Sequence, residues 1–200
     1  MEPVRLITGT ALPVDRADVD TDQIIPSEWL KRVERSGFGD GLFSEWRRDP
    51  SFVLNDPSYA GATILLAGPN FGIGSSREHA VWALSDYGFK AVVSERFGEI
   101  FRNNATRSGL VPATVAREAA HTLIGATRER PRLEITIDVD SRVVIASEIG
   151  FEVPFELDDD ARERLLRGLD DIGMTLEYED VITRFERARP ADLPSLTSLD

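Results

Sequence analysis

The sequence ATILLAG at residues 62–68 is an unbroken apolar run with the length of a strand, and it is typical of a buried strand. A glycine-containing turn follows it, and residues 78–89 then have the spacing of a helix that ends near Gly88. A second buried strand is expected in KAVVSE at residues 90–95. This order of strand, turn, helix and strand, with mostly β-hairpin elements on either side, predicts an α/β domain of modest size.

The other expected elements depend on local signals, namely helix stops, prolines and alternating apolar residues. They are a strand at 4–12, a polar loop at 15–26, a short helix at 27–33 capped by Ser27, an ordered but adaptable glycine-rich loop at 34–43, a connector at 49–61, a helix at 96–109 ended by Gly109, an extended piece at 110–115, a helix at 118–127, a hairpin of 132–140 with 142–149, an extended piece at 151–157, and helices at 158–171 and 177–189. A length of 200 residues suits one compact domain, or one domain with an elaborated edge. We predict one unit over residues 1–188 and a flexible tail at 189–200.

Composition excludes several classes of function. The chain has 35 acidic and 23 basic residues, so it lacks the excess of basic residues that nucleic-acid binders usually carry, and an anionic substrate would need a locally positive pocket. It has no cysteine, so it can form no disulfide, hold no iron–sulfur cluster by itself and use no thiol nucleophile. The N-terminus lacks the apolar core of a signal peptide, and no apolar run is long enough for a membrane span, which predicts a soluble cytoplasmic protein.

The segment NFGIGSSREHA, which runs from Asn70 to Ala80, carries the strongest chemical signal. Its GIGSSR part follows a buried strand and opens a helix, and Glu95 stands about twenty residues on, as in a dinucleotide-binding turn. Arg77, however, takes the place of the third glycine, where a long charged side chain would hinder close packing of helix on strand. A phosphate loop would need Gly-Lys-Ser/Thr, and a nucleophile elbow would need a glycine after its serine; neither is present.

Two other motifs have ordinary structural explanations. His79 and His121 are the only histidines, and each is expected to be a packed or capping residue rather than a base. The segment DVDTDQ at residues 18–23 begins like a calcium loop, but its sixth position is Gln23 and its twelfth is Trp29. It is expected to be a turn whose aspartates accept hydrogen bonds from local amides, or one that supplies an aspartate to orient a neighbouring group.

Anion binding is the chemistry that best suits the Asn70–Ala80 segment. Backbone N–H groups at Gly72 and Gly74, together with the positive end of the following helix, favour a carboxylate or a developing oxyanion. The guanidinium of Arg77 adds a partner that can bind a carboxylate through two hydrogen bonds. In such a field Ser75 could act as a base on a carbon acid; the alternative is that it caps the helix.

Several motifs in order along the chain carry a resemblance to a known family. They are DVDTDQIIPSEWLKRV, SGFGDGLF, GPNFGIGSSREHAVWALSDYGF, FGEIFRNNA and GLDDIGMTL. The sequence resembles the 3-isopropylmalate dehydratase small-subunit family from about residue 10 to beyond residue 185. The resemblance implies an aconitase-like swivel domain, which is a β/β/α layered or barrel-like α/β unit with peripheral helices. It also implies a large subunit that carries a [4Fe–4S] cluster, and an isomerisation of 2- and 3-isopropylmalate by dehydration and rehydration in leucine biosynthesis.

Carried onto this sequence, the family's pattern implies that Ser75 is the catalytic base and that Arg77 binds a substrate carboxylate. Asp22 matches an aspartate near the site. Ser76 is then a donor to the substrate, beside the backbone of Gly74, and the chain itself binds no metal.

The second arginine with which aconitase-like proteins bind their substrate's additional carboxylate has no clear counterpart in this sequence. An apolar substrate group would not need it, and we expect Trp29, Leu30 and the GFGDGLF loop at 37–43 either to contact the isopropyl group or to pack in the core and interface. Two alternatives stay open at this point. The chain could serve a related hydro-lyase acting on homoaconitate or 2-methylmalate, or it could be a nucleotide-binding regulatory module.

Overall fold

The computed structural model describes residues 1–31 and 37–189. Its strands are β1 (Leu6–Val14), β2 (Ile64–Ala67), β3 (Ala91–Ser94), β4 (Val111–Thr114), β5 (Glu134–Asp138), β6 (Val143–Ala146) and β7 (Phe151–Pro154). Its α-helices are α1 (Thr21–Ile24), α2 (Glu78–Tyr87), α3 (Glu99–Ser108), α4 (Arg117–Glu129), α5 (Asp159–Arg167), α6 (Asp171–Leu176) and α7 (Glu179–Ala188). Short 3₁₀ helices are η1 (Ser27–Lys31), η2 (Phe38–Gly41), η3 (Trp46–Arg48), η4 (Val53–Asn55), η5 (Pro57–Tyr59) and η6 (Ser147–Ile149).

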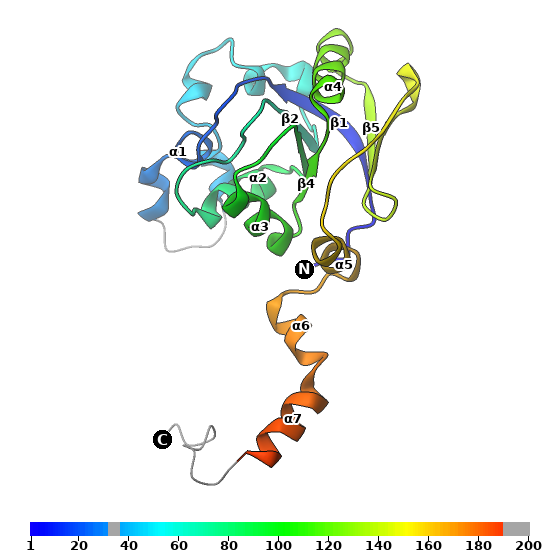
Figure 1. The fold of residues 1–200 in the computed structure, drawn as a ribbon. Helices are drawn as coiled ribbons and strands as arrows, with labels where there is room; N and C mark the ends of the chain where they lie inside the picture. The colour runs from blue at the N-terminus through cyan, green and yellow to red at the C-terminus, as the bar shows by residue number, and fades with distance from the viewer. Residues whose placement is uncertain (32–36, 190–200) are drawn as a thin grey trace.

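One curled sheet of seven strands, in the order β4-β3-β2-β1-β5-β6-β7, organises the molecule (Figure 1). Strand β1 is long enough to belong to both halves of it. Its end at Ala11–Val14 pairs in parallel with β2, whereas its beginning at Leu6–Thr10 pairs antiparallel with β5. Strands β2, β3 and β4 continue the parallel half, and β5, β6 and β7 form an antiparallel meander. The predicted α/β architecture, a layered or barrel-like sheet with peripheral helices, is confirmed.

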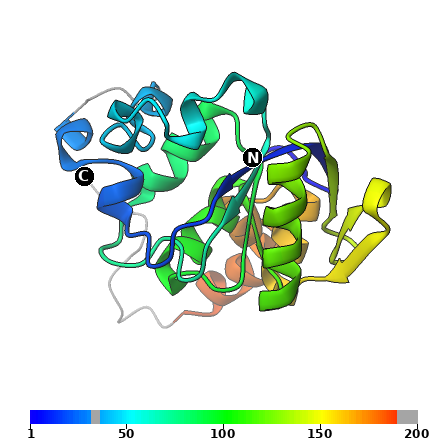
Figure 2. The same cartoon turned by 90° about the horizontal axis from the view of Figure 1, so that it is seen from above.

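The two faces of the parallel half pack in two separate cores, because successive strand side chains point to opposite faces. In β1, Leu12 and Val14 join the core with α2, α3 and the segment 19–62, whereas Ile7 and Ala11 join the core with α4 and α5. Figure 2 shows α4 on one side of the strands and the segments 19–31 and 37–62 on the other. Covering of both faces explains why β2 is apolar along its whole length.

Most of the predicted elements are present. Helices α2 and α3 end at Gly88 and Gly109 as predicted, and β5 and β6 form the predicted hairpin. The predicted polar loop over 15–26 is wrong at Thr21–Ile24, where Asp20 caps the four-residue helix α1. Ser27 is the first residue of η1 instead of a helix cap, and residues 32 and 33 of the predicted helix lie outside the described residues.

The C-terminal helices α6 and α7 extend away from the sheet and its two cores (Figure 1). Within residues 1–31 and 37–189, no helix is both long and apolar enough to cross a membrane. The division into one unit at 1–188 and a flexible tail at 189–200 stays a prediction, since residues 190–200 lie outside the described part of the chain.

Candidate active site

The loop between β2 and α2 depends on two glycines. Gly72 has φ +74° and Gly74 has φ +93°, a backbone region that side chains with a Cβ rarely occupy. At Gly72 space is also lacking, because an added Cβ would lie 2.3 Å from Cγ of the buried Phe101. At Gly74 the nearest atom would be Cβ of Asp20 at 3.5 Å, so only the backbone conformation requires glycine. The loop thus turns sharply and carries Ser75 and the residues after it to the surface.

The DVDTDQ segment lies directly against this loop. Asp20 and Gln23 form a capping box, in which the Asp20 carboxylate accepts from the Gln23 N–H at 2.7 Å and the Gln23 amide oxygen accepts from the Asp20 N–H at 2.9 Å. The predicted hydrogen bond from a local amide to an aspartate is therefore confirmed at Asp20, but it caps helix α1 instead of closing a turn. The buried Thr21 donates its N–H to the Ile73 carbonyl and its hydroxyl to the Ser75 carbonyl, both at 3.0 Å.

Asp22 forms an ion pair with Arg77. The Arg77 side chain is 18% exposed and that of Asp22 is 55% exposed, so the guanidinium is held at the surface by a solvated carboxylate. Solvation of the carboxylate weakens the attraction, but the contact still limits the directions in which the guanidinium can point. The structure thus brings together Asp22, Ser75 and Arg77, three residues that the sequence indicated as catalytic.

The alternative role of Ser75 as a helix cap is wrong. Helix α2 begins at Glu78 with Arg77 at its cap position, and no side chain caps it by a hydrogen bond. Within the described residues, the Ser75 and Ser76 hydroxyls make no hydrogen bond, and both side chains are exposed. Both hydroxyls are therefore available to a ligand.

The backbone donors differ from the expected set. The N–H groups of Gly72 and Ile73 both donate to the Val19 carbonyl, at 2.7 and 3.2 Å, so the prediction that the Gly72 N–H faces an anion is wrong. In the described part of the chain, the N–H groups of Gly74, Ser75 and Ser76 have no hydrogen-bond partner. Successive free N–H groups ahead of a helix N-terminus, beside a guanidinium, have the chemistry that suits a carboxylate or an oxyanion.

The two histidines differ in environment. His79 packs between the rings of Phe38 and Trp82, with ring centroids 5.3 and 4.7 Å away, which confirms its predicted packing role. His121 is exposed within α4, so the prediction of a packed or capping residue is wrong there. His121 lies on the face of α4 that is exposed to solvent, where a polar side chain needs no contact with the protein.

Trp29 packs in the core that includes α2, and an added Cβ at Gly41 would lie 2.6 Å from Cδ2 of its indole. Glycine is therefore needed at residue 41 of the glycine-rich loop, because the Trp29 indole lies directly against the Gly41 backbone. Leu30 is half-buried beside it in η1. Packing of Trp29 is observed, and contact of either side chain with a substrate stays a prediction.

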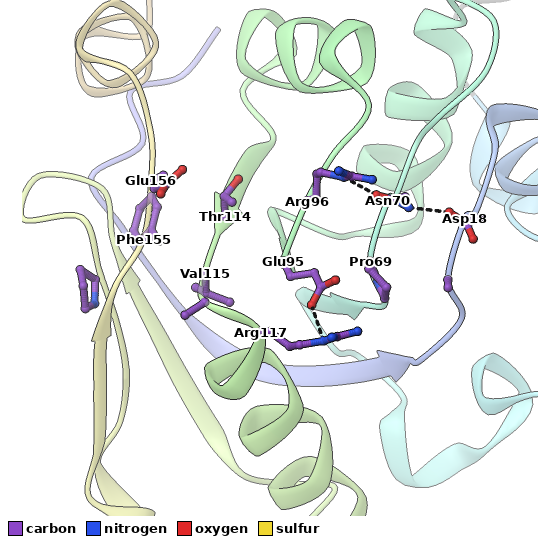
Figure 3. A pocket seen from close by; sticks show the side chains of 13 residues that line it. Asp18, Pro69, Asn70, Glu95, Arg96, Thr114, Val115, Arg117, Phe155 and Glu156 are labelled. Carbon is purple, nitrogen blue, oxygen red and sulfur yellow. Dashed lines mark hydrogen bonds and ion pairs between the residues drawn. The ribbon is translucent and has the colours of Figure 1, made fainter.

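A cavity of about 800 Å³ lies where β2, β3 and β4 reach their carboxyl ends, a common place for ligands in α/β proteins (Figure 3). Asn70 donates to the Asp18 carboxylate at 2.5 Å and accepts from the guanidinium of Arg96. Across the cavity, Arg117 pairs with Glu95 at 3.3 Å. The Glu95 carboxylate therefore has a protein partner, and its position after β3 does not require the ribose of a dinucleotide.

The charged groups of this cavity largely compensate one another. Its lining contains the carboxylates of Asp18, Glu95 and Glu156 and the guanidinium groups of Arg96 and Arg117. It consequently gives an anion no net attraction, in contrast to the Ser75 loop. The polar chain of Asp18, Asn70 and Arg96 connects the β1–α1 loop to the segment after β3.

Two residues that organise the loops near Ser75 have no role assigned from the sequence, namely Thr21 and Asn70. Thr21 lies inside the DVDTDQ motif, but its burial and its contact with a loop more than fifty residues away leave no local signal. Asn70 could have been noticed from its place before two glycines, because asparagine tolerates the left-handed backbone that it adopts here with φ +59°.

A metal ion or an iron–sulfur cluster requires several ligating side chains close together. No group of three or more His, Cys, Asp or Glu side chains able to hold a metal ion occurs in the described ranges. The sequence has no cysteine to provide a thiolate. An iron–sulfur cluster would therefore need another chain.

The curled mixed sheet and the loop after β2, which carries Ser75, Ser76 and Arg77, together describe a class of protein domain. Two family models show which class it is. Residues 1–118 match the model of the aconitase C-terminal domain, so the chain contains that type of domain. Residues 171–197, which include α6 and α7, match the model of the C-terminal domain of the 3-isopropylmalate dehydratase small subunit.

Individual relatives agree with the second model. The 3-isopropylmalate dehydratase small subunit of Frankia alni is 60% identical over 195 residues, covering 98% of this chain and 99% of that protein. The one from Rubrobacter xylanophilus is 55% identical over 194 residues, covering 97% and 98%. The crystal structure of 3-isopropylmalate dehydratase from Methanocaldococcus jannaschii superimposes with a TM-score of 0.67 at 26% identity, covering 90% of this chain and 98% of that one. The chain belongs to the 3-isopropylmalate dehydratase small-subunit family, and the swivel-domain fold implied by the motifs is confirmed.

Proposed function

We propose that this chain supplies the Ser75 loop to the active site of a 3-isopropylmalate dehydratase, which it forms with a large subunit. The reaction interconverts 2-isopropylmalate and 3-isopropylmalate through 2-isopropylmaleate, a hydro-lyase step of leucine biosynthesis. The observation that supports this proposal is the Ser75–Ser76–Arg77 run. Its two serines are exposed, their backbone N–H groups have no partner within the described residues, and the Arg77 guanidinium lies beside them, a combination that suits a dicarboxylate. A cytoplasmic location stays a prediction.

Ser75 is the proposed base. Its Oγ, in the alkoxide form, removes a proton from the carbon next to the one that carries the hydroxyl group; as hydroxide departs, the two carbons become doubly bonded. In rehydration the two groups exchange positions. Ser75 returns the proton to the carbon that lost the hydroxyl group, and the hydroxyl adds to the carbon that lost the proton. The N–H groups of residues 74–76, the N-terminus of α2 and the Arg77 guanidinium all favour the alkoxide electrostatically.

Arg77 binds a substrate carboxylate in this proposal, and Ser76 donates a hydrogen bond to the substrate. Asp22 orients Arg77 through their ion pair. Because a guanidinium makes two parallel hydrogen bonds with a carboxylate, it sets the orientation of the substrate as well as its affinity. A fixed carboxylate brings the carbon acid to a defined distance from Ser75.

The [4Fe–4S] cluster belongs, in our proposal, to the large subunit, where it supplies a Lewis acid for the substrate hydroxyl group and a carboxylate. This assignment agrees with the absence of cysteine from the chain. Proton removal and carboxylate orientation remain with Ser75 and Arg77.

Selectivity for the isopropyl group is proposed to depend on Trp29 and Leu30. Both are half-buried in η1, where they can present apolar surface to a bound substrate. In the Leu30→Arg variant, the activity toward 2-isopropylmalate should fall relative to that toward homoaconitate, because an arginine there favours a third carboxylate. An unchanged preference in a panel that also includes 2-methylmalate would count against a role for Leu30.

Reconstitution with the large subunit tests the role of Ser75. We expect Ser75→Ala to lower kcat by at least about 100-fold, since general-base catalysis contributes about 10²–10⁴-fold. Ser85→Ala is the matched control, because Ser85 is an exposed serine at the far end of α2. Wild-type turnover by Ser75→Ala would remove the proposed base, and tight NAD binding by a chain that supports no hydration would favour a nucleotide-binding module instead.

A further inference from the structure

We propose that Thr21 is a positioning residue for Ser75, a role that rests on the function proposed above. It is the first residue of α1, lies 54 residues before Ser75 and contacts the β2–α2 loop. It reaches no reacting atom itself in this proposal; it acts only through the serine.

Thr21 holds the loop on both sides of Gly74, its residue with a left-handed backbone. Its N–H donates to the carbonyl of Ile73, directly before Gly74, and its hydroxyl donates to the carbonyl of Ser75, directly after it. Gly74 itself has φ +93°, outside the region that most residues adopt. Two hydrogen bonds from one residue therefore fix the turn that sets the position of the Ser75 backbone.

The anchor is rigid, and the serine side chain is not otherwise held. Thr21 is only 2% exposed, and the capping box of Asp20 and Gln23 fixes the helix in which it lies. Within the described residues, the Ser75 hydroxyl has no partner, so its position depends on the backbone. Thr21 and Asp22 are neighbours in the chain and hold Ser75 and Arg77 respectively, so the two proposed functional groups share one support.

The hydroxyl of Thr21 is the group to test, because the Thr21 backbone bond survives substitution. In the enzyme reconstituted with its large subunit, Thr21→Val should lower kcat by about 10- to 100-fold and leave KM within about threefold, because misplacement by about 1 Å can cost 10²-fold. Thr21→Ser keeps the hydroxyl and should recover kcat to within about threefold of wild type. If Thr21→Val does not assemble, Thr21→Ala replaces it under the same criterion.

Thr106→Val is the matched control. Thr106 is also buried, and its hydroxyl also donates to a backbone carbonyl, that of Asn103 at 3.0 Å, but within α3. It should lower the urea midpoint of the chain without lowering kcat. An equal loss of kcat in Thr106→Val would mean that Thr21 acts only through general stability, and would overturn the proposal.

The double variant Thr21→Val/Ser75→Ala separates this inference from the proposed function. If Thr21 acts through Ser75, the double variant is no slower than Ser75→Ala alone. Wild-type kcat in Thr21→Val with an inactive Ser75→Ala refutes the positioning role and leaves the base in place. Wild-type kcat in Ser75→Ala refutes the base itself.

Discussion

The Gly72→Ala substitution tests the account of the β2–α2 loop most directly. The added Cβ would lie 2.3 Å from Cγ and 2.6 Å from Cβ of Phe101. Rotation of the Phe101 ring cannot relieve the second contact, because that Cβ is fixed by the backbone of α3. The loop or the helix must therefore move. The two backbones are already close at the start of α3, because a Cβ added to Gly98 would lie 2.4 Å from the carbonyl oxygen of Gly72.

Two costs add at this position. The backbone has φ +74°, which costs an L-residue about 1–2 kcal/mol relative to glycine. Overpacking against a buried aromatic side chain costs about 1–3 kcal/mol more. Alanine also restricts the unfolded chain, which offsets roughly 0.4–1 kcal/mol of the loss.

Gly74→Ala is the comparison that isolates the second cost. Gly74 also has a positive φ, +93°, but its added Cβ would meet nothing closer than 3.5 Å. Because the backbone cost and the effect on the unfolded chain are similar in the two variants, their difference reports the contact with Phe101. Gly72→Ala should be less stable than Gly74→Ala by about 1–3 kcal/mol.

Urea unfolding followed by tryptophan fluorescence measures this difference. With an m-value of about 2 kcal/mol/M, the midpoint of Gly72→Ala should lie roughly 0.5–1.5 M below that of Gly74→Ala. Equal midpoints, or a lower midpoint for Gly74→Ala, would refute the argument that close approach of α3 requires glycine at residue 72.

Two further predictions concern charge. Arg77→Lys in the reconstituted enzyme should raise KM for isopropylmalate by about 10- to 100-fold, because one charge-assisted hydrogen bond of about 1.5–3 kcal/mol is lost; an unchanged KM in steady-state rates would contradict two-point carboxylate binding. For Asp138, burial raises the pKa, but hydrogen bonds from Ser141 and the Asp140 N–H and the charge of Arg5 outweigh it, so its pKa is lowered from 3.8. The carboxylate thus stabilises the hairpin above the unfolded-state pKa, and the stability advantage of wild type over Asp138→Asn should shrink as the pH falls below about 4, toward the folded pKa; a difference in urea midpoint that does not change with pH would contradict this.

The local elements near the middle of the chain were predictable because their signals are local. The apolar run at 62–68, the helix stop at Gly88 and the alternation at 132–149 each depend on residues within one turn or one strand of each other. The prediction was wrong at α1, where a four-residue helix owes its existence to the Asp20 cap and to packing of Ile24 in the core. A helix this short has too little periodicity to be detected.

The candidate site was predictable in its residues but not in its geometry. The types and order of Ser75, Ser76 and Arg77 indicated carboxylate chemistry, and the neighbouring motifs indicated the family. That the Gly72 N–H is used inside the protein, by the Val19 carbonyl, could not be read from the sequence. It depends on how two loops approach each other after both strands have joined the sheet.

By itself, the sequence determined the strand–turn–helix–strand unit, the family and the absence of any thiolate for a cluster. These follow from residue chemistry and short-range backbone preferences. The tertiary structure alone decided that β1 is shared by a parallel and an antiparallel half-sheet. It also decided that Thr21 and Asp22 hold Ser75 and Arg77 across more than fifty residues of chain. Such contacts arise only when strand pairing brings distant loops to one edge of the sheet, and no local pattern in the chain encodes that distance.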